Sequence, residues 1–501
     1  MKYFLLFIVA LALVLRLPQL TGSFWLDEAA QALEVTRPWH QQLNIVDDFQ
    51  PPFMHVLLHI AQYASHSEWW LRLWGALIPG LLTVALTYQL GKKAAAPVIG
   101  AAAAILVATS SLHVFYSQEL RPYMLPALFA SFTWYLLLTN TKLKPKSQLA
   151  FVLATAAGLY SSYLYPFVII GQALFQLATS AQERKQFLLL TSFGVLLFAP
   201  WIPGFLDQLH AGQQLRSDLP GWEVVVSTPQ LKVLPLTLGK FIYGIVPIDL
   251  NVWYILPIIL IGALVLTNLH KPLAAISKSE QRFLFGLVCW SLGSILVAWL
   301  VSFWIPVVQP KRVLYALPAL YLFVTHLLLF HLEPVIKKQR APIRFTVKQR
   351  LSIYAVAGLL VINLAGLTRY YADPQLQREN WRSLISEMHQ RYPAEKSIAV
   401  FSFPEPFAPF RWYTDSYPTV STGKLTTAAV PDLADQLKPV IEYEYVLVFD
   451  YLRDLTDPDN HVPITLESFG FKQVELIDYP NIGFVRVFSK SPTVTAYAHR
   501  H

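Results

Sequence analysis

Two adjacent carboxylates, Asp27 and Glu28, are the residues of this sequence best suited to acid–base chemistry. They follow Trp25, directly after the first apolar segment, and tryptophan is enriched where a protein leaves the membrane. Carboxylates beside lipid are costly unless they are solvated or partnered. One of the two can therefore serve as a general base. The alternative is a charge pair that stabilises the N-terminus of a helix.

A turn of mixed charge, 116–123 (YSQELRPY), separates two apolar segments. Its side chains Tyr116, Glu119 and Tyr123 are possible substrate-binding groups. Arg121 is a candidate for binding a donor phosphate, because a guanidinium holds a phosphate through two charge-assisted hydrogen bonds. The alternative is a surface ion pair between Arg121 and Glu119, which adds little to stability.

A second basic turn, 310–315 (PKRVLY), contains Lys311 and Arg312. Both basic turns are predicted on the outer face of the membrane, where short loops usually avoid lysine and arginine. The alternative for the second turn is snorkelling of the long side chains at the start of a helix. Two exceptions on one face favour a bound anion, so Lys311 and Arg312 join Arg121 as candidate phosphate-binding residues.

Two histidines, His55 and His59, are four residues apart, the spacing that places two metal ligands on one face of a helix. They lack the glutamate that a metalloprotease helix carries between them. We expect interfacial histidines and no metal site; a divalent metal is possible, but the sequence does not support one. Asp47 and Asp48 precede them and bind a cation or an acceptor, or form a solvated turn. Asp48 and His55 are thus possible substrate-binding residues.

The composition indicates how these residues are positioned. Of the 501 residues, 54% are hydrophobic and 14% are charged, whereas a soluble domain has about 25% charged residues. A bilayer core of about 30 Å needs roughly 20 apolar residues per helix. We predict an α-helical polytopic membrane protein with about eleven transmembrane helices. The predicted spans are 3–20, 70–91, 97–114, 122–139, 148–161, 164–180, 187–203, 251–269, 283–303, 313–331 and 351–367.

The segment 148–180 is long for one helix and short for two. Pro166 favours two helices, because proline disrupts a helix interior. With two helices, the basic loops around Lys92, Lys142, Arg184 and Lys278 all fall on the cytoplasmic side, together with the run 337–350. The N-terminus is then cytoplasmic and the C-terminus outside. The net charge of +8 thus reflects membrane topology, and no nucleic acid is expected as a partner.

Two domains are predicted. Residues 1–367 form a transmembrane catalytic region that includes the outside loops 21–69 and 204–250. Residues 368–501 form a non-cytoplasmic soluble domain in which helix-like and strand-like segments alternate, as in an α/β domain. The helix-like segments are 379–391 and 432–442, and the strand-like segments are 397–403, 443–452, 471–477 and 482–488. The single cysteine, Cys289, cannot form an internal disulfide.

Several of these motifs together resemble the membrane-embedded GT-C glycosyltransferases, which implies a GT-C-like fold for the helical region. The most similar group is the family-39-like bacterial enzymes related to protein O-mannosyltransferases and aminoarabinose transferases. The resemblance rests on a retained first helix followed by 26–29 (LDEA), on Pro51-Pro52, on 117–123 (SQELRPY), on 311–318 (KRVLYALP) and on Asn380-Trp381-Arg382. Gln50 departs from the histidine that many relatives have before the two prolines, and Val313 departs from the usual tyrosine.

The resemblance implies transfer of a hexosyl or pentosyl group from a polyprenyl-phosphate donor to an acceptor hydroxyl on the outer face of the membrane. It implies that Asp27 is the general base of an inverting reaction and that Glu28 orients the acceptor or the donor. Arg121, with Lys311 or Arg312, then neutralises the phosphate as charge develops on it. The implied partners are the polyprenyl-phosphate-linked sugar, a lipid, glycan or protein acceptor, and the bilayer of a plasma or inner membrane.

The competing interpretation is a membrane transporter or flippase of lipid-linked or small polar substrates. Such proteins often contain internal repeats and ionisable residues near the middle of the membrane. We find no repeat, and the ionisable residues lie at the predicted outside turns. A third interpretation, a scaffold that presents the C-terminal domain, does not need Asp27 or Arg121. The lack of a glycine-rich phosphate loop in the sequence argues against nucleotide-powered chemistry.

A reporter fused after Arg369 tests the predicted topology. Eleven spans and a cytoplasmic N-terminus put Arg369 outside, so a reporter that is active only after export is expected to be active there. The same reporter fused after Lys146, in a predicted cytoplasmic loop, is the control and is expected to be inactive. An inactive Arg369 fusion would contradict the eleven-span topology and would favour one helix over 148–180.

Overall fold

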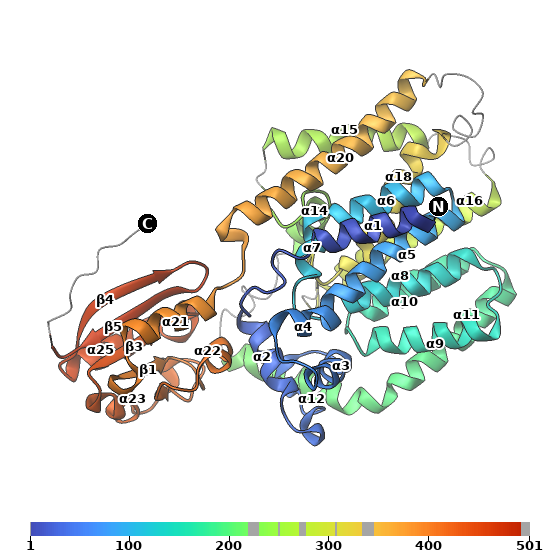
Figure 1. Cartoon of the computed structure of the whole chain (residues 1–501). Helices are drawn as coiled ribbons and strands as arrows, with labels where there is room; N and C mark the ends of the chain where they lie inside the picture. Colours follow the sequence, from blue (N-terminus) through green and yellow to red (C-terminus); the bar gives the residue numbers. More distant parts are fainter. Residues whose placement is uncertain are drawn as a thin grey trace. The chain divides into compact units, whose positions relative to one another are not determined.

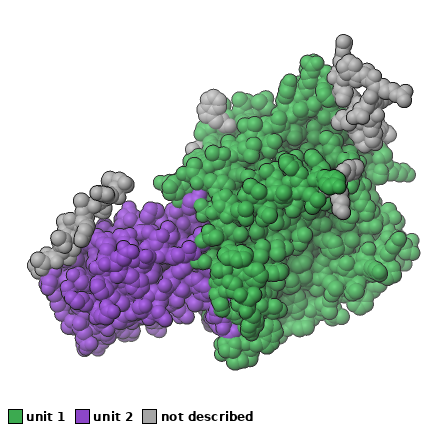
Figure 2. Space-filling view, in the orientation of Figure 1, with its two compact units in different colours: residues 1–21, 38–208, 227–376 green, residues 22–37, 209–226, 377–501 purple. Residues whose placement is uncertain are grey.

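The computed structural model describes most of the chain, and the described ranges are 2–218, 230–248, 251–269, 277–305, 308–332 and 345–491. Part of the predicted loop 204–250 lies outside these ranges, as do Lys271 and most of the basic run 337–350. The chain divides into two compact units (Figure 2), and each is described by itself. Unit 1 comprises residues 1–21, 38–208 and 227–376, and unit 2 comprises residues 22–37, 209–226 and 377–501.

Unit 1 is helical (Figure 1). Its helices are α1 (Lys2–Val14), α3 (Phe53–Gln62), α4 (Glu68–Arg72), α5 (Ile78–Ala94), α6 (Pro97–Thr109), α7 (Ser111–Tyr116), α8 (Met124–Thr139), α9 (Pro145–Leu159), α10 (Tyr165–Leu177), α11 (Ala181–Phe198), α14 (Gln230–Tyr243), α15 (Val252–Leu269), α16 (Lys278–Val288), α17 (Ser294–Val301), α18 (Leu317–Leu329) and α20 (Val347–Ala372). A further helix, α12 (Ile202–Asp218), begins in unit 1 and ends in unit 2.

Four helical stretches among the described residues are long and apolar enough to cross a membrane, judged by length and composition. They are Glu68–Ala94, Ala181–Leu215, Lys278–Val301 and Val347–Ala372. Shorter apolar helices occupy most of the other predicted spans, for example Pro97–Thr109 and Met124–Thr139. The total of eleven spans therefore stays a prediction. The break predicted at Pro166 is confirmed, because α9 ends at Leu159 and α10 begins at Tyr165.

Two glycines allow α5 and α6 to pack at close range. A methyl group built on Gly91 lies 2.5 Å from the Cα atom of Gly100, and one built on Gly100 lies 2.6 Å from the backbone nitrogen of Lys92. Both distances are too short for a real Cβ atom, so neither helix tolerates a side chain at this crossing. Such close contacts between small residues are typical of helix pairs in membranes, where backbone approach replaces the hydrophobic driving force.

Unit 2 is an α/β domain with a five-stranded sheet in the order β2-β1-β3-β5-β4. β1 is parallel to β2 and β3, whereas β5 is antiparallel to β3 and β4. The strands are β1 (Ser397–Phe401), β2 (Thr419–Ser421), β3 (Tyr445–Phe449), β4 (Lys472–Tyr479) and β5 (Gly483–Ser489). The helices are α2 (Leu26–Val35), α21 (Trp381–Arg391), α22 (Ala408–Tyr413), α23 (Leu433–Leu437), α24 (Arg453–Thr456) and α25 (His461–Ser468).

Both faces of the central strands are buried, because alternate residues of a strand point to opposite faces. Ala399 and Phe401 of β1 pack with residues of α21 and α22, such as Trp381 and Phe410. Ile398 and Val400 lie in a second core with residues of α23 and α25. This arrangement explains why β1 and β3 are continuous apolar runs in the sequence.

The predicted α/β character of the C-terminal region is confirmed, and each of its predicted strands corresponds to an observed one. The sequence missed β2, which has only three residues and no internal periodicity. The predicted helix over 432–442 is divided into the α-helix Leu433–Leu437 and a 3₁₀ segment, Lys438–Glu442. Pro439 explains this division, because proline cannot donate the backbone hydrogen bond that would continue an α-helix.

The crossing of α5 and α6 predicts a large difference between two glycine substitutions. Gly100→Ala should lower the free energy of unfolding by about 1–3 kcal/mol, because the methyl group has no space. Gly358→Ala, in α20, is the matched control: no atom lies within 4 Å of its added methyl group, so no loss of stability is expected. Thermal unfolding of the purified variants in detergent measures both. Equal melting temperatures would contradict the close packing at Gly100.

Candidate functional site

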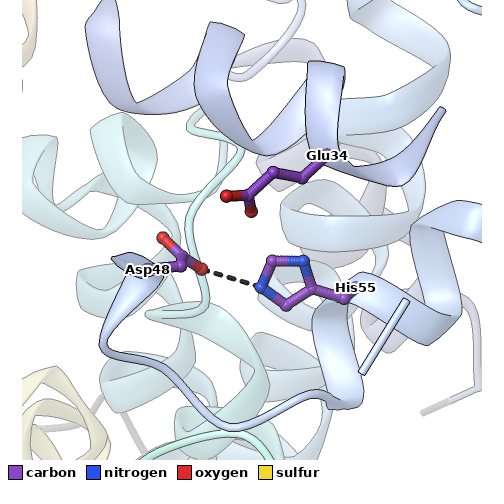
Figure 3. A group of neighbouring side chains, drawn as sticks. All are labelled: Glu34, Asp48 and His55. Atoms are coloured by element: carbon purple, nitrogen blue, oxygen red, sulfur yellow. Dashed lines mark hydrogen bonds and ion pairs between the residues drawn. The ribbon is translucent and has the colours of Figure 1, made fainter. Parts of the chain in front are cut away.

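An ionised carboxylate, Asp48, is the centre of a polar cluster in unit 1. Its Oδ1 atom accepts hydrogen bonds from Arg121 Nη1 at 3.0 Å and from Gln50 Nε2 at 3.0 Å. Its Oδ2 atom accepts one from His55 Nε2 at 2.7 Å, which Figure 3 shows as a dashed line. Glu34, also drawn in Figure 3, belongs to unit 2. The structure thus brings together Asp48, His55 and Arg121, which are candidates from different parts of the sequence.

The electrostatics of this cluster depend on its low exposure to water. The exposed fraction of the side chain is 8% for Asp48, 0% for His55 and 12% for Arg121. Burial by itself raises the pKa of Asp48, but the charge of Arg121 and the hydrogen bond from His55 hold that pKa below its usual value. Asp48 therefore remains ionised at neutral pH, with Arg121 as its cationic partner and with hydrogen bonds from His55 and Gln50.

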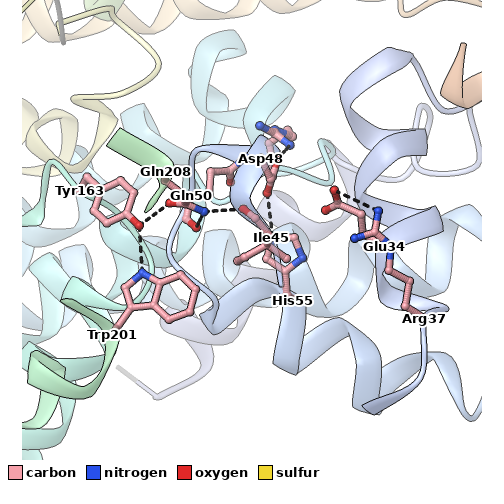
Figure 4. Close-up of polar contacts among 10 residues, drawn as sticks. Glu34, Arg37, Ile45, Asp48, Gln50, His55, Tyr163, Trp201 and Gln208 are labelled. Carbon is pink, nitrogen blue, oxygen red and sulfur yellow. Dashed lines mark hydrogen bonds and ion pairs between the residues drawn. The ribbon is translucent and has the colours of Figure 1, made fainter. Parts of the chain in front are cut away.

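A chain of hydrogen bonds holds the Asp48 loop in place (Figure 4). Trp201 Nε1 donates to the Tyr163 hydroxyl at 2.9 Å, and this hydroxyl donates to Gln208 Oε1 at 2.5 Å. Gln208 Nε2 in turn donates to the backbone oxygens of Ile45 at 2.6 Å and Gln50 at 2.9 Å. The amide of Gln208 therefore fixes both ends of the loop that carries Asp48.

The backbone of the same loop is strained. Phe49, which follows Asp48, has a φ of +52°, in the left-handed region. A residue with a side chain pays roughly 1–2 kcal/mol for this conformation. Because strain of this kind persists only where surrounding contacts enforce it, the loop is shaped by the ion pair and by Gln208.

The predicted turn 116–123 is also held from several directions. Gln118 Nε2 donates to the backbone oxygen of Arg16 at 2.8 Å, and Gln118 Oε1 accepts from the Tyr370 hydroxyl at 3.0 Å. These contacts connect the turn to the ends of α1 and α20. Glu119, beside Arg121, is only 2% exposed. Arg121 is thus anchored through its backbone neighbours as well as through Asp48.

The two basic turns lie side by side. The rings of Tyr116 and Tyr123 make an edge contact with their centroids 5.0 Å apart. Lys311 Nζ lies 5.5 Å from the centroid of the Tyr123 ring, within the range of a cation–π interaction. Lys311 and its neighbour Arg312 are both partly buried. Tyr123 therefore joins the turn of Arg121 to that of Lys311.

The second histidine of the spaced pair, His59, lies beside two polar residues that follow it in the chain. Its Nδ1 atom is 2.9 Å from Gln62 Nε2, and its Nε2 atom is 3.2 Å from the Tyr63 hydroxyl. His55, in contrast, bonds to Asp48. The two histidines of the spaced pair therefore have different hydrogen-bond partners.

The acidic pair belongs to unit 2, where Asp27 and Glu28 lie in the first turn of α2. Their environments differ. Asp27 is partly exposed, whereas Glu28 is fully buried and its Oε2 atom lies 3.8 Å from Arg378 Nε. Two neighbouring carboxylates with different exposure are suited to different roles. Asp27 keeps part of its surface exposed to solvent, and Glu28 is buried beside a positively charged partner.

Several residues of these clusters were missed by the sequence analysis. Gln208 and Tyr163 carry no recognisable motif, and Arg378 was not singled out. Glu379 was assigned only to the start of a helix, whereas its carboxylate accepts hydrogen bonds from Trp381 Nε1 at 2.6 Å and from the Tyr451 hydroxyl at 2.7 Å. For Arg378 and Glu379 the available signal was their position directly before the Asn380-Trp381-Arg382 motif.

Solved structures of two membrane glycosyltransferases of the GT-C superfamily, ArnT and an archaeal oligosaccharyltransferase, are similar to this chain. ArnT from Cupriavidus metallidurans in the apo state has a TM-score of 0.58 and 12% sequence identity, covering 98% of both chains. ArnT bound to undecaprenyl phosphate has a TM-score of 0.57 and 11% identity, covering 97% of both chains.

The oligosaccharyltransferase of Archaeoglobus fulgidus, tethered to an acceptor peptide, has a TM-score of 0.55 and 13% identity. This match covers 97% of the present chain and 74% of the other. No protein-family model matches the chain, and no curated protein matches its sequence. At these identities the similarity shows the fold: the chain has a GT-C fold, and with its apolar helices it is an integral membrane protein.

The Asp48 cluster predicts unequal effects for two adjacent aspartates. Asp48→Asn removes the negative partner of Arg121 and should lower the free energy of unfolding by about 1.5–3 kcal/mol at pH 7. Asp47→Asn, at an exposed position, should change it by less than about 0.5 kcal/mol. Thermal unfolding in detergent distinguishes the two variants. A stable Asp48→Asn protein would show that the ion pair contributes little.

The same cluster predicts the pH dependence of this difference. Because the pKa of Asp48 is lower in the folded protein than in the unfolded chain, its contribution is fully present above the unfolded value of about 3.9. The contribution is lost as the pH falls through the folded pKa. The melting temperatures of the wild type and of Asp48→Asn should therefore converge at strongly acidic pH.

Proposed function

We propose that this protein is a membrane glycosyltransferase that moves a sugar from a polyprenyl-phosphate donor to an acceptor hydroxyl on the outer face of the membrane. The observation that carries the proposal is the GT-C fold over 97–98% of the chain. One ArnT structure of this fold is bound to undecaprenyl phosphate, and one structure of the archaeal oligosaccharyltransferase contains a dolichol-phosphate. A polyprenyl phosphate is therefore the donor class that this fold suggests for the present chain.

In this proposal Asp27 is the general base. It takes the proton of the acceptor hydroxyl while the hydroxyl oxygen attacks the anomeric carbon. The bond from that carbon to the phosphate oxygen breaks, the anomeric configuration is inverted, and the polyprenyl phosphate leaves. The partial exposure of Asp27 supports this role, because a base must reach its substrate. Glu28, buried beside Arg378, serves to orient α2 and through it the reactants.

The donor phosphate is bound by Arg121 together with Lys311 and Arg312. The hydrogen bond from Arg121 to Asp48 holds the guanidinium in one orientation, so less conformational entropy is lost when a phosphate binds. Lys311, in cation–π contact with Tyr123, supplies a second positive charge beside this turn. Positive groups fixed in advance stabilise the charge that develops on the leaving phosphate. Tyr116, Glu119 and His55 complete the proposed substrate-binding surface.

The proposed location is the plasma or inner membrane, with the N-terminus in the cytoplasm. Residues 1–367 then form the membrane-embedded catalytic region, and residues 368–501 form the domain outside. A donor anchored by its lipid enters from the side, through the bilayer. This arrangement explains why the proposed phosphate-binding turns follow apolar helices.

Substitution of Asp27 tests the proposal. Asp27→Asn keeps the shape of the side chain and removes the proton acceptor, so transfer should fall by roughly 10²–10⁴-fold. Glu28→Gln is the control and should cause a smaller loss. The measurement is transfer of a labelled sugar from undecaprenyl phosphate in reconstituted vesicles. Full activity of Asp27→Asn would rule out this residue as the base.

Binding of undecaprenyl phosphate, measured with the same proteins, separates the base from the phosphate site. Asp27→Asn should bind this lipid as the wild type does. Arg121→Ala should bind it about 10–100-fold more weakly, because a charge-assisted contact of about 1.5–3 kcal/mol is lost. Arg121→Lys should recover only part of the affinity, since an ammonium group cannot form the paired hydrogen bonds that a planar guanidinium makes with a phosphate. Unchanged binding by Arg121→Ala would show that Arg121 has a purely structural role.

A further inference from the structure

The segment that carries Asp27 is part of the fold of unit 2. The backbone N–H of Phe24 donates to the Tyr413 hydroxyl at 2.7 Å, and the Phe24 ring contacts Trp412 with 5.6 Å between centroids. Ser23 Oγ accepts a hydrogen bond of 3.2 Å from the backbone of Arg382. Helix α2 also packs against α22. The first turn of α2 is therefore positioned by residues of α21 and α22, which lie more than 340 positions further along the chain.

Glu379 is the residue of unit 2 whose carboxylate faces this first turn. Its two oxygens accept hydrogen bonds from Trp381 Nε1 at 2.6 Å and from the Tyr451 hydroxyl at 2.7 Å. The backbone N–H of Leu26, the first residue of α2, interacts with the same carboxylate. Trp381 is itself fully buried, and its ring packs against Phe449 of β3. The carboxylate is thus fixed by the core of the unit and meets α2 at its N-terminus.

We propose that Glu379 is a positioning residue, which holds the N-terminal turn of α2 and thereby sets the orientation of the Asp27 carboxylate. This inference rests on the proposed function, because it gives Glu379 a role in the reaction through Asp27. The mechanism is the attraction between a carboxylate and the unsatisfied N–H groups at the start of a helix. Trp25, at the N-cap position, has no side-chain oxygen that can accept these bonds.

The protonation of Glu379 is coupled to this role. Burial, with a further contribution from the charge of Asp27, raises the pKa of Glu379 to about 7, although Trp381, Tyr451 and Leu26 all donate to its ionised form. Further charged groups near this turn are Glu28, its partner Arg378, and Arg382, whose guanidinium lies over the Tyr413 ring. The ionised carboxylate is the stronger acceptor, so α2 is held more firmly above pH 7 than below it.

A rise in pH is expected to change stability and activity in opposite directions. Activity should rise as Glu379 ionises and holds α2 more firmly, whereas stability should fall. The folded pKa of Glu379 lies above its unfolded value of 4.5, so the folded protein binds the proton more tightly than the unfolded chain. Stability therefore decreases as the pH rises from about 4.5 to about 7. Replacing the carboxylate with an amide should relieve this cost at pH 8 and should weaken the hold on α2. A residue whose only role is to stabilise the fold would not lower the stability of the protein at pH 8.

Glu379→Gln is the central variant, with Asp457→Asn as the matched control. Asp457 is also a buried carboxylate of unit 2; it accepts hydrogen bonds from the backbone of His461 at 2.8 Å and from Thr427 Oγ1 at 2.8 Å. Three quantities are measured on the full-length protein in detergent or vesicles. They are hydrogen exchange of the backbone amides of residues 26–35, the melting temperature at pH 5 and pH 8, and kcat and KM for undecaprenyl-phosphate-linked mannose.

For Glu379→Gln we expect about 10-fold faster exchange in residues 26–35 and a kcat about 10-fold lower, since misplacement of a reacting group is costly. The donor KM should stay within about twofold, since the proposed phosphate-binding residues are unchanged. At pH 8 the melting temperature should equal or exceed that of the wild type, and the rise of wild-type activity through about pH 7 should disappear. Asp457→Asn should lower the melting temperature without changing exchange in α2.

Wild-type exchange in residues 26–35 of the Glu379→Gln protein would overturn the proposal, whatever its activity. If Glu379→Gln does not fold, the Tyr451→Phe variant is used in its place. This substitution removes one hydrogen-bond donor to Glu379 and keeps the ring contact with Trp381 at 5.6 Å. The same increase in exchange, of smaller size, is then expected, and its absence would overturn the proposal. Full activity of Asp27→Asn would instead refute the proposed base and leave the exchange result to be judged separately.

Discussion

A carboxylate away from water stays ionised only beside a positive partner, and this constraint shapes the polar part of unit 1. Asp48 meets the constraint with Arg121, which lies 73 residues further along the chain. The ion pair joins the loop before α3 to the turn before α8, and Gln208 adds α12 to the same network. The left-handed backbone of Phe49 is the conformational cost of this arrangement. A guanidinium placed where a phosphate is expected is therefore already oriented by an internal anion.

Hydropathy, proline and strand alternation made the helical region, the break before α10 and the α/β character of the C-terminal domain predictable, because these signals are local. The fold also brings two of the sequence motifs together, since Lys311 lies over the ring of Tyr123. The ion pair of Asp48 with Arg121 and the hydrogen bond from Tyr451 to Glu379 were not predictable. They join residues far apart in the chain, and no short-range pattern encodes such pairs. β2, with three residues, is too short for any periodicity to appear.

Two neighbouring carboxylates in one helical turn show how strongly environment determines chemistry. Asp27 keeps contact with solvent, whereas Glu28 is fully buried next to Arg378. Sequence alone makes them equivalent acids in the first turn of a helix. The fold makes one accessible and neutralises the other, and a nearby carboxylate, Glu379, has a pKa that burial raises towards neutrality. Separating acidic groups in this way is how proteins assign different tasks to the same functional group.

The long-range contact between Phe24 and Tyr413 has a consequence for biogenesis. These residues are 389 positions apart, so the segment that carries Asp27 is synthesised long before the surface on which it packs. At about 5–20 residues per second, translation needs roughly 20–80 s to reach Tyr413. During this interval α2 lacks α22 (Ala408–Tyr413), the helix against which it packs. The surface around Tyr413 thus completes a structural element that was synthesised long before it.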